Sequence, residues 1–599
     1  MTESLLSRLG AHFSMPAGQP VDALHGFALV EVRPDARALL RLERGGDALV
    51  VELTPSSSEA RVYRRTRRFG VSYRKESGAE PPLAIVDAFV ALVSAREASL
   101  PDAWIEELFA RPEEAPLRAS TGERRAPAVL EHVDRLDGSR RPIRVVLANL
   151  CEDPCDYGPG ASEYLRAKLL DTPDIAERIE LTILFLSGVD TDGFAERIAA
   201  HDPDFVGFTC YSWNLAATAH TTRRLRALTG ERRGAPVVVW GGVSFALFRE
   251  RNDWFSWWSD VDAVAVGSGE QTIVDLVRRV IDRGPGRGLG ADPVAGTLSN
   301  VDGRIVDGGP AIAPRDLAEV PSPYQRGAAF QVARPFVEMA RGCRFQCAFC
   351  SDARASRQGL WMTRTVDRIA ADIAAIVAWP TAREIDAGAS TANVSDEHFA
   401  EVCEGIRRGD PSARLSYSLQ MYPAIVRPSQ RAALEGVRVK RIGIGVQSST
   451  PETWGPMRRK STIEHIRRSA EILRGVGPLF ITVLLGLPGE TYDSFVKMLD
   501  ELLRIDDLSI AVHRLLVLPG TQFHVRHEAL GLTFAPERFY RVLGTRTMPA
   551  SELARAQEHT RARANASGFT SLGERRIDWT NFDDQPLAFD GAPMPTPAR

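Results

Sequence analysis

The 599-residue sequence lacks any run of apolar residues long enough to cross a bilayer. A membrane-spanning helix needs roughly 20 such residues, and the longest largely apolar runs, such as residues 480–485, are far shorter. Residues 1–20 also lack a basic segment followed by an apolar run, which is the pattern of a secretory signal. We therefore expect a cytoplasmic protein with no membrane partner.

An excess of charge of either sign is also missing. The 74 lysines and arginines are balanced by 77 acidic residues, which leaves a net charge of −3. Without a basic surface excess, no nucleic acid partner is expected. The 44% hydrophobic and 25% charged content is ordinary for a soluble protein, and the length predicts about three or four domains.

Cysteine is scarce, with 7 residues in the whole chain. So few cysteines, unevenly spaced, do not form a disulfide framework. Three of them fall within residues 343–350, and such bunching is typical of a metal site. Cys151 and Cys155 are interpreted as loop or core thiols, because the cytoplasm is reducing.

Residues 1–125 are predicted to form an N-terminal α+β domain, with a strand at 48–53 and no chemical motif. Its one unusual feature is an arginine-dense segment at residues 61–68, RVYRRTRR, for which a solvated charged face is the expected role. A polar stretch near residues 117–141 reads as a linker.

Residues 140–290 alternate apolar strands with helical segments, which predicts a doubly wound α/β domain with a parallel sheet. Strands are expected at 143–149, 179–186, 205–210, 236–240 and 263–266. In such a sheet the ligand binds beyond the carboxyl ends of the strands, where glycines allow close approach. The candidate ligand-binding residues at these ends are Tyr211, Ser212, Trp213, Gly241, Gly242, Val243, Gly267 and Gly269.

A hairpin-like stretch at residues 296–309 leads into a second alternating region, residues 325–535. Strands are expected at 336–340, 384–387, 415–419, 441–446, 480–485 and 510–516. Six such βα units predict a partial barrel with its catalytic groups at the strand carboxyl ends. Residues 536–599 are expected to be a small helical and then coil-like C-terminal region.

Directly after the first strand of this region the sequence reads RGCRFQCAFC, with Cys343, Cys347 and Cys350 at spacings of four and three. Three thiolates on one loop can hold three irons of a cubane and leave the fourth iron exposed. A structural zinc site is the alternative, but it needs four closed ligands. The nearest further candidates, His398 and Cys403, lie dozens of residues away.

This cysteine pattern, at this place in a partial (β/α)₆ barrel, resembles the radical S-adenosylmethionine superfamily. The resemblance implies a [4Fe–4S] cluster on the three cysteines and S-adenosylmethionine beside it. Strand ends two, four and five of the family cradle S-adenosylmethionine, which carries over here to Gly388 and Ser390, to Gln447 and Ser448, and to residues 485–491. The second of these strand ends departs from the family's GGE-like pattern.

A flavodoxin-like domain directly before such a barrel resembles the cobalamin-dependent branch of the family, over roughly residues 140–530. The resemblance implies bound cobalamin, without a histidine axial ligand, because residues 149–155 contain none. Within that branch the chain is similar to the tryptophan 2-C-methyltransferases of thiopeptide antibiotic biosynthesis. The implied reaction moves a methyl group from S-adenosylmethionine through methylcobalamin to carbon 2 of L-tryptophan, with an electron donor as partner.

Two hypotheses concern individual residues. Glu270 follows a glycine loop that faces the barrel, so its carboxylate is a candidate catalytic group beside the exposed iron or the corrin. Arg65 or Arg67 is the candidate cover for the lower cobalt face, where a positive charge disfavours oxidised, cationic cobalt.

Other readings of the same motifs stay open. Among enzymes, the alternatives are a radical methylase that acts on an sp³ carbon or a phosphinate, and a cobalamin-dependent ring-forming enzyme. From another class, the alternative is a non-catalytic cobalamin or redox sensor, although the sequence shows no recognisable output domain.

Overall fold

The structure is a computed structural model of the chain. It divides into two compact units, and the first unit consists mainly of residues 1–129. In the first unit it describes five strands. In the remainder it describes residues 128–135, 141–151, 158–187, 190–211, 214–230, 235–242, 260–284, 289, 292–301, 304–353, 361–506, 508–535, 540–567, 576–580, 588–589 and 592–593.

The first unit contains a five-stranded sheet in which each strand pairs antiparallel with the next. Its strands are β1 Ala28–Leu29, β2 Ala38–Arg44, β3 Asp47–Leu53, β4 Ala60–Arg65 and β5 Ser72–Glu76. The strand expected at 48–53 is therefore present as β3. Arg65 ends β4, and Arg67 lies outside the described residues.

The second unit contains the predicted doubly wound sheet. Its strand order is β13-β12-β11-β10-β9-β7-β8-β6, which includes the 2-1-3-4-5 order of a flavodoxin-like domain. The strands are β6 Ala128–Asp134, β7 Ile143–Cys151, β8 Ile179–Ser187, β9 Phe205–Thr209, β10 Val237–Gly241, β11 Ala263–Ala265, β12 Thr297–Val301 and β13 Arg304–Asp307. All five predicted strands are confirmed, and so is the hairpin, because β12 pairs antiparallel with β13.

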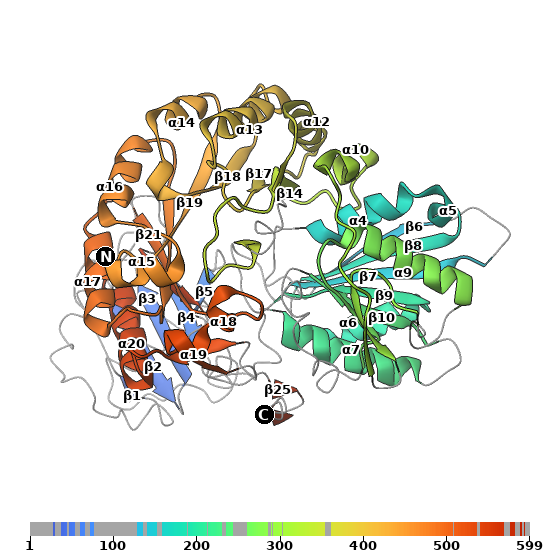
Figure 1. Ribbon diagram of the computed structural model, residues 1–599, viewed down its shortest axis with the longest axis horizontal. Helices are drawn as coiled ribbons and strands as arrows, with labels where there is room; N and C mark the ends of the chain where they lie inside the picture. Colours follow the sequence, from blue (N-terminus) through green and yellow to red (C-terminus); the bar gives the residue numbers. More distant parts are fainter. Residues whose placement is uncertain are drawn as a thin grey trace, which may run out of the picture. The chain divides into compact units, whose positions relative to one another are not determined.

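Helices cover both faces of this sheet (Figure 1). They are α4 Gly160–Leu170, α5 Pro173–Ala176, α6 Thr191–Ala200, α7 Leu215–Thr229 and α9 Gly269–Arg283. The strands are buried almost continuously, as β7 and β8 show, because a parallel sheet between two helical layers has no wet face.

The predicted partial barrel is a seven-stranded sheet in which every neighbouring pair is parallel. Its strands, in order, are β14 Phe336–Glu338, β17 Glu384–Gly388, β18 Ser416–Met421, β19 Val439–Gln447, β20 Leu479–Leu485, β21 Leu508–Arg514 and β24 Ile577–Thr580. Short strands β15 Ala340–Arg341 and β16 Met362–Thr363 form a separate antiparallel pair. The six strands read from the sequence are confirmed.

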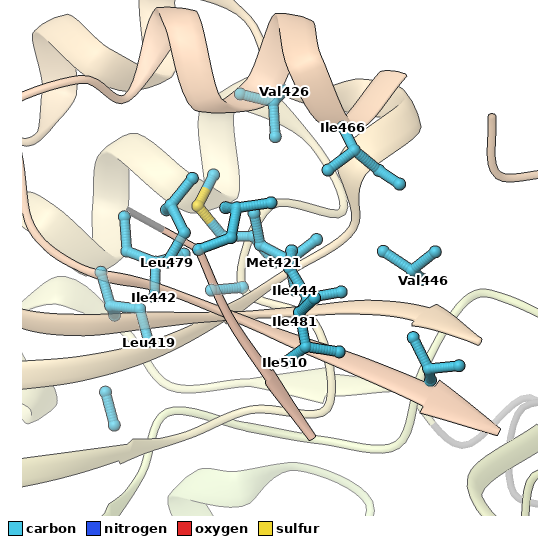
Figure 2. Close-up of a cluster of buried hydrophobic side chains, with 14 of the residues drawn as sticks. Leu419, Met421, Val426, Ile442, Ile444, Val446, Ile466, Leu479, Ile481 and Ile510 are labelled. Carbon is cyan, nitrogen blue, oxygen red and sulfur yellow. The ribbon is translucent and has the colours of Figure 1, made fainter. Parts of the chain in front are cut away.

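Helices line the outer side of the curved sheet (Figure 1). They are α12 Val366–Val377, α13 Asp396–Gly409, α14 Pro428–Ala433, α16 Ile463–Ile472, α17 Tyr492–Leu503 and α20 Ala550–Ser567, and the shorter helices of this part of the chain are α10 Pro323–Arg326, α15 Pro451–Met457, α18 Gln522–Val525 and α19 His527–Leu530. Figure 2 shows part of the core between strands and helices, in which Ile442, Ile444 and Val446 of β19 are fully buried. The alternate residues of β19 therefore face the inside of the barrel.

The C-terminal region differs from expectation. A helix was predicted here and is present as α20. The segment predicted as coil, however, contains β24, which joins the barrel sheet beside β21. Strand β24 therefore extends the barrel sheet to residue 580. A four-residue strand is too short to show a clear alternation of apolar and polar residues within a polar segment. Two further pairs, β22 Thr533–Ala535 with β23 Arg541–Gly544 and β25 Ala588–Phe589 with β26 Ala592–Pro593, are antiparallel.

Within the described residues, no helix is both long and apolar enough to traverse a bilayer.

Candidate cluster and cofactor site

The three cysteines lie on one loop that begins where the first barrel strand ends. Cys343 and Cys347 are buried, Cys350 is half-buried, and all three are free thiols. The loop is held to the barrel by the Ala348 N–H, which donates to the Met457 carbonyl (2.9 Å) at the end of α15. The cysteine loop therefore follows the carboxyl end of the first barrel strand, where the sequence placed it.

The donor set fits a cubane better than a single ion. Among the residues with described positions, no group of three His, Cys, Asp or Glu side chains can hold one metal ion, so the zinc alternative finds no closed site there. A cubane asks something different, because each cysteine binds a separate iron and the sulfurs need not converge on one point. Three free thiols on one short loop meet that requirement.

Burial also shapes the chemistry of the thiols. It raises the pKa of Cys343 above its ordinary value and raises the pKa of Cys350 to about 12. The protein alone therefore keeps these two groups as neutral thiols at neutral pH. Because iron binds the thiolate form, loading the site releases protons.

A cation that sequence reasoning missed stands beside the loop. The Arg459 guanidinium donates from Nη1 to Cys347 Sγ (3.4 Å) and from Nη2 to the Gly445 carbonyl. It also lies over the Tyr422 ring, with Cζ 4.0 Å from the ring centroid. One arginine thus joins the cysteine loop to the end of β19. Nothing in the local sequence distinguishes it from its neighbour Arg458.

The end of β17 carries two predicted S-adenosylmethionine contacts. A Cβ on Gly388 would stand 2.2 Å from Cζ of Phe336, so the absence of a side chain makes room for that ring. The Ser390 hydroxyl donates to the carboxylate of Asp352, which lies two residues after Cys350. The end of β17 is thereby tied to the cysteine loop.

The end of β19 carries the other predicted pair. Gln447 has a positive φ of 68°, and β19 shifts register against β20 between Gly445 and Gln447. A side chain in this backbone region is uncommon and tends to mark a functional site. Ser448 turns away from the surface: it is fully buried and its hydroxyl donates to Glu490 Oε1 (2.7 Å).

The carboxyl ends of the flavodoxin-like sheet bring the predicted glycines together. Gly242 has a φ of 130°, and a Cβ there would stand 2.3 Å from the Cys210 carbonyl oxygen. A Cβ on Gly241 would meet only Ala265 at 3.6 Å, and Gly267 has a φ of 105°. Glycine at Gly242 and Gly267 is therefore required by the backbone itself. Ser212, Trp213 and Val243 lie outside the described residues.

Asn214 ends the predicted loop that begins at Tyr211. Its buried amide nitrogen donates to the Leu150 and Thr209 carbonyls (3.0 and 3.1 Å). Its Oδ1 accepts from the Tyr211 N–H (2.7 Å). The side chain thus fixes the loop after β9, which carries the predicted contact Tyr211.

Glu270 reaches the barrel, as expected. It lies in the first turn of α9, directly after Gly269, and its Oε1 accepts from Arg341 Nη2 (2.6 Å). Arg341 precedes Cys343 by two residues and also donates from Nε to Glu338 Oε1 (2.7 Å). Burial alone would lower the pKa of Arg341, but these two carboxylates outweigh it and raise the pKa above its ordinary value. Glu270 Oε2 is buried without a hydrogen-bond partner among the described residues.

Comparisons with known proteins follow the same division. Residues 337–502 match the model of the radical SAM superfamily, and residues 176–277 match the model of the B12 binding domain.

Two solved structures share the fold over most of the chain. One is the radical S-adenosylmethionine methyltransferase TsrM from Kitasatospora setae, with tryptophan substrate and a SAM analog (aza-SAM) bound. It is 17% identical, with a TM-score of 0.50, over 73% of this chain and 85% of that one. The other is the cobalamin-dependent S-adenosylmethionine radical enzyme OxsB, with aqua-cobalamin and S-adenosylmethionine bound. It is 13% identical, with a TM-score of 0.55, over 89% of this chain and 77% of that one.

A curated relative is the tRNA-2-methylthio-N(6)-dimethylallyladenosine synthase of Sorangium cellulosum. It is 28% identical over an alignment of 237 positions that covers 35% of this chain. The chain spans 45% of the length of that protein.

Proposed function

Because this chain is a radical SAM enzyme with a B12-binding domain, and so uses a [4Fe–4S] cluster, S-adenosylmethionine and cobalamin, we propose that it is a C-methyltransferase. When bound, these cofactors supply a methyl group from the sulfonium of S-adenosylmethionine and carry it by way of cobalt to a carbon acceptor. The proposed substrate is L-tryptophan, methylated at carbon 2.

The observation that carries the proposal is the link between Glu270 and Arg341. It joins the glycine-lined edge of the flavodoxin-like sheet to the cysteine loop of the barrel. The two proposed cofactor sites thus belong to elements in direct contact, as the transfer of a methyl group between them requires. The substrate rests on a weaker support, which is the fold shared with a methyltransferase whose structure holds tryptophan.

The protein's own contribution is placement. We assign Cys343, Cys347 and Cys350 to the cluster. We assign to the S-adenosylmethionine site Gly388, Ser390, Gln447 and Ser448. Ser448 contributes through its buried hydroxyl, which donates to Glu490. Tyr211, Ser212, Trp213, Gly241, Gly242, Val243, Gly267 and Gly269 are assigned to the cobalamin site.

An isotope experiment tests the reaction. The anaerobically reconstituted protein is incubated with methyl-labelled S-adenosylmethionine, L-tryptophan and a reductant. Label in 2-methyltryptophan is the expected result, and a triple Cys→Ala variant at the loop is the control. Obligatory release of 5′-deoxyadenosine would favour radical chemistry on an sp³ carbon, a phosphinate or a ring-forming substrate. No labelled product with any acceptor would favour a sensor.

Glu270 is assigned a catalytic role through its second carboxylate oxygen, which is buried and has no partner among the described residues. That oxygen is available to the exposed iron or to the corrin, while the first stays bonded to Arg341. Replacing Glu270 by Gln keeps the shape and removes the charge, and Glu270→Ala removes both. Both variants are expected to alter the cluster's spectrum and to slow turnover. An unchanged spectrum and rate in Glu270→Ala would end this assignment.

Arg65 and Arg67 remain the proposed cover for the lower cobalt face. Arg65→Ala and Arg67→Ala are expected to change the absorption spectrum of the bound cobalamin. Unaltered spectra and activity in both variants would remove the arginines from the site.

A further inference from the structure

The Arg459 guanidinium is held in place by two contacts besides the one it makes with Cys347. Its Nη2 donates to the Gly445 carbonyl, and its plane lies over the Tyr422 ring. Tyr422 is itself fixed, because its hydroxyl donates to the Lys460 carbonyl (2.8 Å) and its ring meets Phe345 with centroids 4.6 Å apart. Since Phe345 belongs to the cysteine loop, the guanidinium, the tyrosine and the loop form one packed unit.

Gly445 makes this position possible. A Cβ there would stand 3.3 Å from Arg459 Nη2 and 2.9 Å from Gln447 Nε2. Both contacts are closer than side chains usually tolerate, so a larger residue would push the guanidinium aside. The absence of a side chain at Gly445 therefore leaves the space in which the Arg459 guanidinium reaches Cys347.

The positive charge of Arg459 has no acidic partner among the residues that the structure describes. Its contacts in the described structure are a sulfur, a carbonyl and an aromatic ring, and no carboxylate pairs with it there. Its buried Nε has no hydrogen-bond partner among the described residues. Arginine stays protonated at any pH of interest. A half-buried cation of this kind stabilises a negative charge that forms beside it, because the surroundings screen the attraction less than water does.

We propose that Arg459 is a positioning residue that donates an N–H to the sulfur of Cys347 in the loaded enzyme and so raises the reduction potential of the cluster. This inference rests on the assignment of the cluster to the three cysteines. Reduction brings one electron from an external donor onto the cluster and makes its charge one unit more negative, while Arg459 keeps its proton. A cation and an N–H at a ligand sulfur stabilise that reduced state, since hydrogen bonds to sulfur help set the potential.

A redox titration tests the inference. The anaerobically reconstituted full-length protein is reduced stepwise with titanium(III) citrate, and the reduced cluster is followed by electron paramagnetic resonance. Arg459→Gln is expected to shift the midpoint potential to a more negative value, and Arg459→Lys is expected to shift it less. Arg458→Gln, at the exposed neighbouring position, is the matched control and should leave the potential unchanged.

A measurement on the wild-type chain avoids dependence on how the variants fold. In protein labelled with ¹⁵N-arginine, pulsed electron paramagnetic resonance of the reduced cluster should show a coupled ¹⁵N nucleus. Arg459→Lys should lose that coupling. Wild-type protein without iron and sulfide would overturn the cysteine assignment together with this inference. A normal cluster with no ¹⁵N coupling, or with an unshifted potential in both Arg459 variants, would overturn the inference alone.

Discussion

Glu490 is a single buried residue that stabilises the turn after strand β19. Its side chain is fully buried, and its Oε1 accepts from the hydroxyls of Ser448 (2.7 Å) and Thr450 (3.4 Å). Burial raises the pKa of Glu490 to about 8. The group is therefore a neutral carboxylic acid in the folded protein at neutral pH, and it holds the turn after β19 through hydrogen bonds without a buried charge.

This raised pKa makes stability depend on pH. The unfolded chain loses the Glu490 proton near 4.5, whereas the folded chain keeps it up to about 8. The folded state holds the extra proton in that window, so this group lowers wild-type stability as pH rises through it. Glu490→Gln copies the protonated form and removes the dependence.

The measurement is a set of thermal unfolding curves for wild type and Glu490→Gln across that pH window. The stability of the variant relative to wild type is expected to rise with pH, by on the order of a few kcal/mol in total. Parallel pH profiles for the two proteins would contradict the buried, protonated state of Glu490.

Sequence predicted the cysteines at this scale but not their surroundings. Three thiols at a fixed spacing carry their own signal, because one loop supplies all the ligands. Arg459 and Asn214 carry none, since each acts on a segment that only the fold brings near: Cys347 is 112 positions away from Arg459, and Leu150 is 64 positions away from Asn214.

At the scale of elements, buried strands were predictable and the weak edge strand was not. Strands such as β7 and β19 sit between helical layers or against the barrel core, and their apolar residues keep a clear pattern. Strand β24 is four residues long and follows a long gap from β21. Only pairing with β21 gives it a strand conformation, and pairing partners do not appear in a local pattern.

The turn between β20 and α17 offers a test of how tightly the strand ends are packed. Gly489 has a φ of 91°, and a Cβ there would stand 2.6 Å from the Glu452 carbonyl oxygen on α15. Gly475 has a similar φ of 77° but nothing within 4 Å of its Cβ position. Gly475→Ala should therefore cost only the backbone strain, about 1 kcal/mol.

Gly489→Ala should cost about 2 kcal/mol more than that, because a backbone carbonyl must also move. The free energies of unfolding of both variants, compared with wild type, check the difference. Equal losses at the two positions would show that the turn does not pack against α15 as described.

At the scale of the second unit, one helical layer of the flavodoxin-like sheet connects to the barrel entrance. Helix α9 contributes Glu270, and α4 contributes Glu163, which accepts from the Ala329 and Phe330 N–H groups (3.0 Å each). Tyr164 of α4 accepts from the Glu338 N–H (3.1 Å). Three side chains of α4 and α9 thus tie this helical layer to the entrance of the barrel.

The order of the two domains was predictable, because apolar strands alternate with helical segments in each of them. Most of these contacts were not predictable. Glu270 was expected to face the barrel, but Glu163 and Tyr164 are ordinary helix residues in the sequence, and their partners lie 166 and 174 positions away. Their role follows from the way the chain leaves one sheet and enters the next.

One chain holds both an iron–sulfur cluster and cobalamin, and an elemental analysis tests this most directly. Iron, sulfide and cobalt are to be measured in anaerobically reconstituted wild-type protein and in the triple Cys→Ala variant at positions 343, 347 and 350. Wild type is expected to hold about four irons, about four sulfides and about one cobalt per chain, and the variant is expected to lose the iron and sulfide while keeping the cobalt. Wild-type protein with neither iron and sulfide nor cobalt would contradict the account.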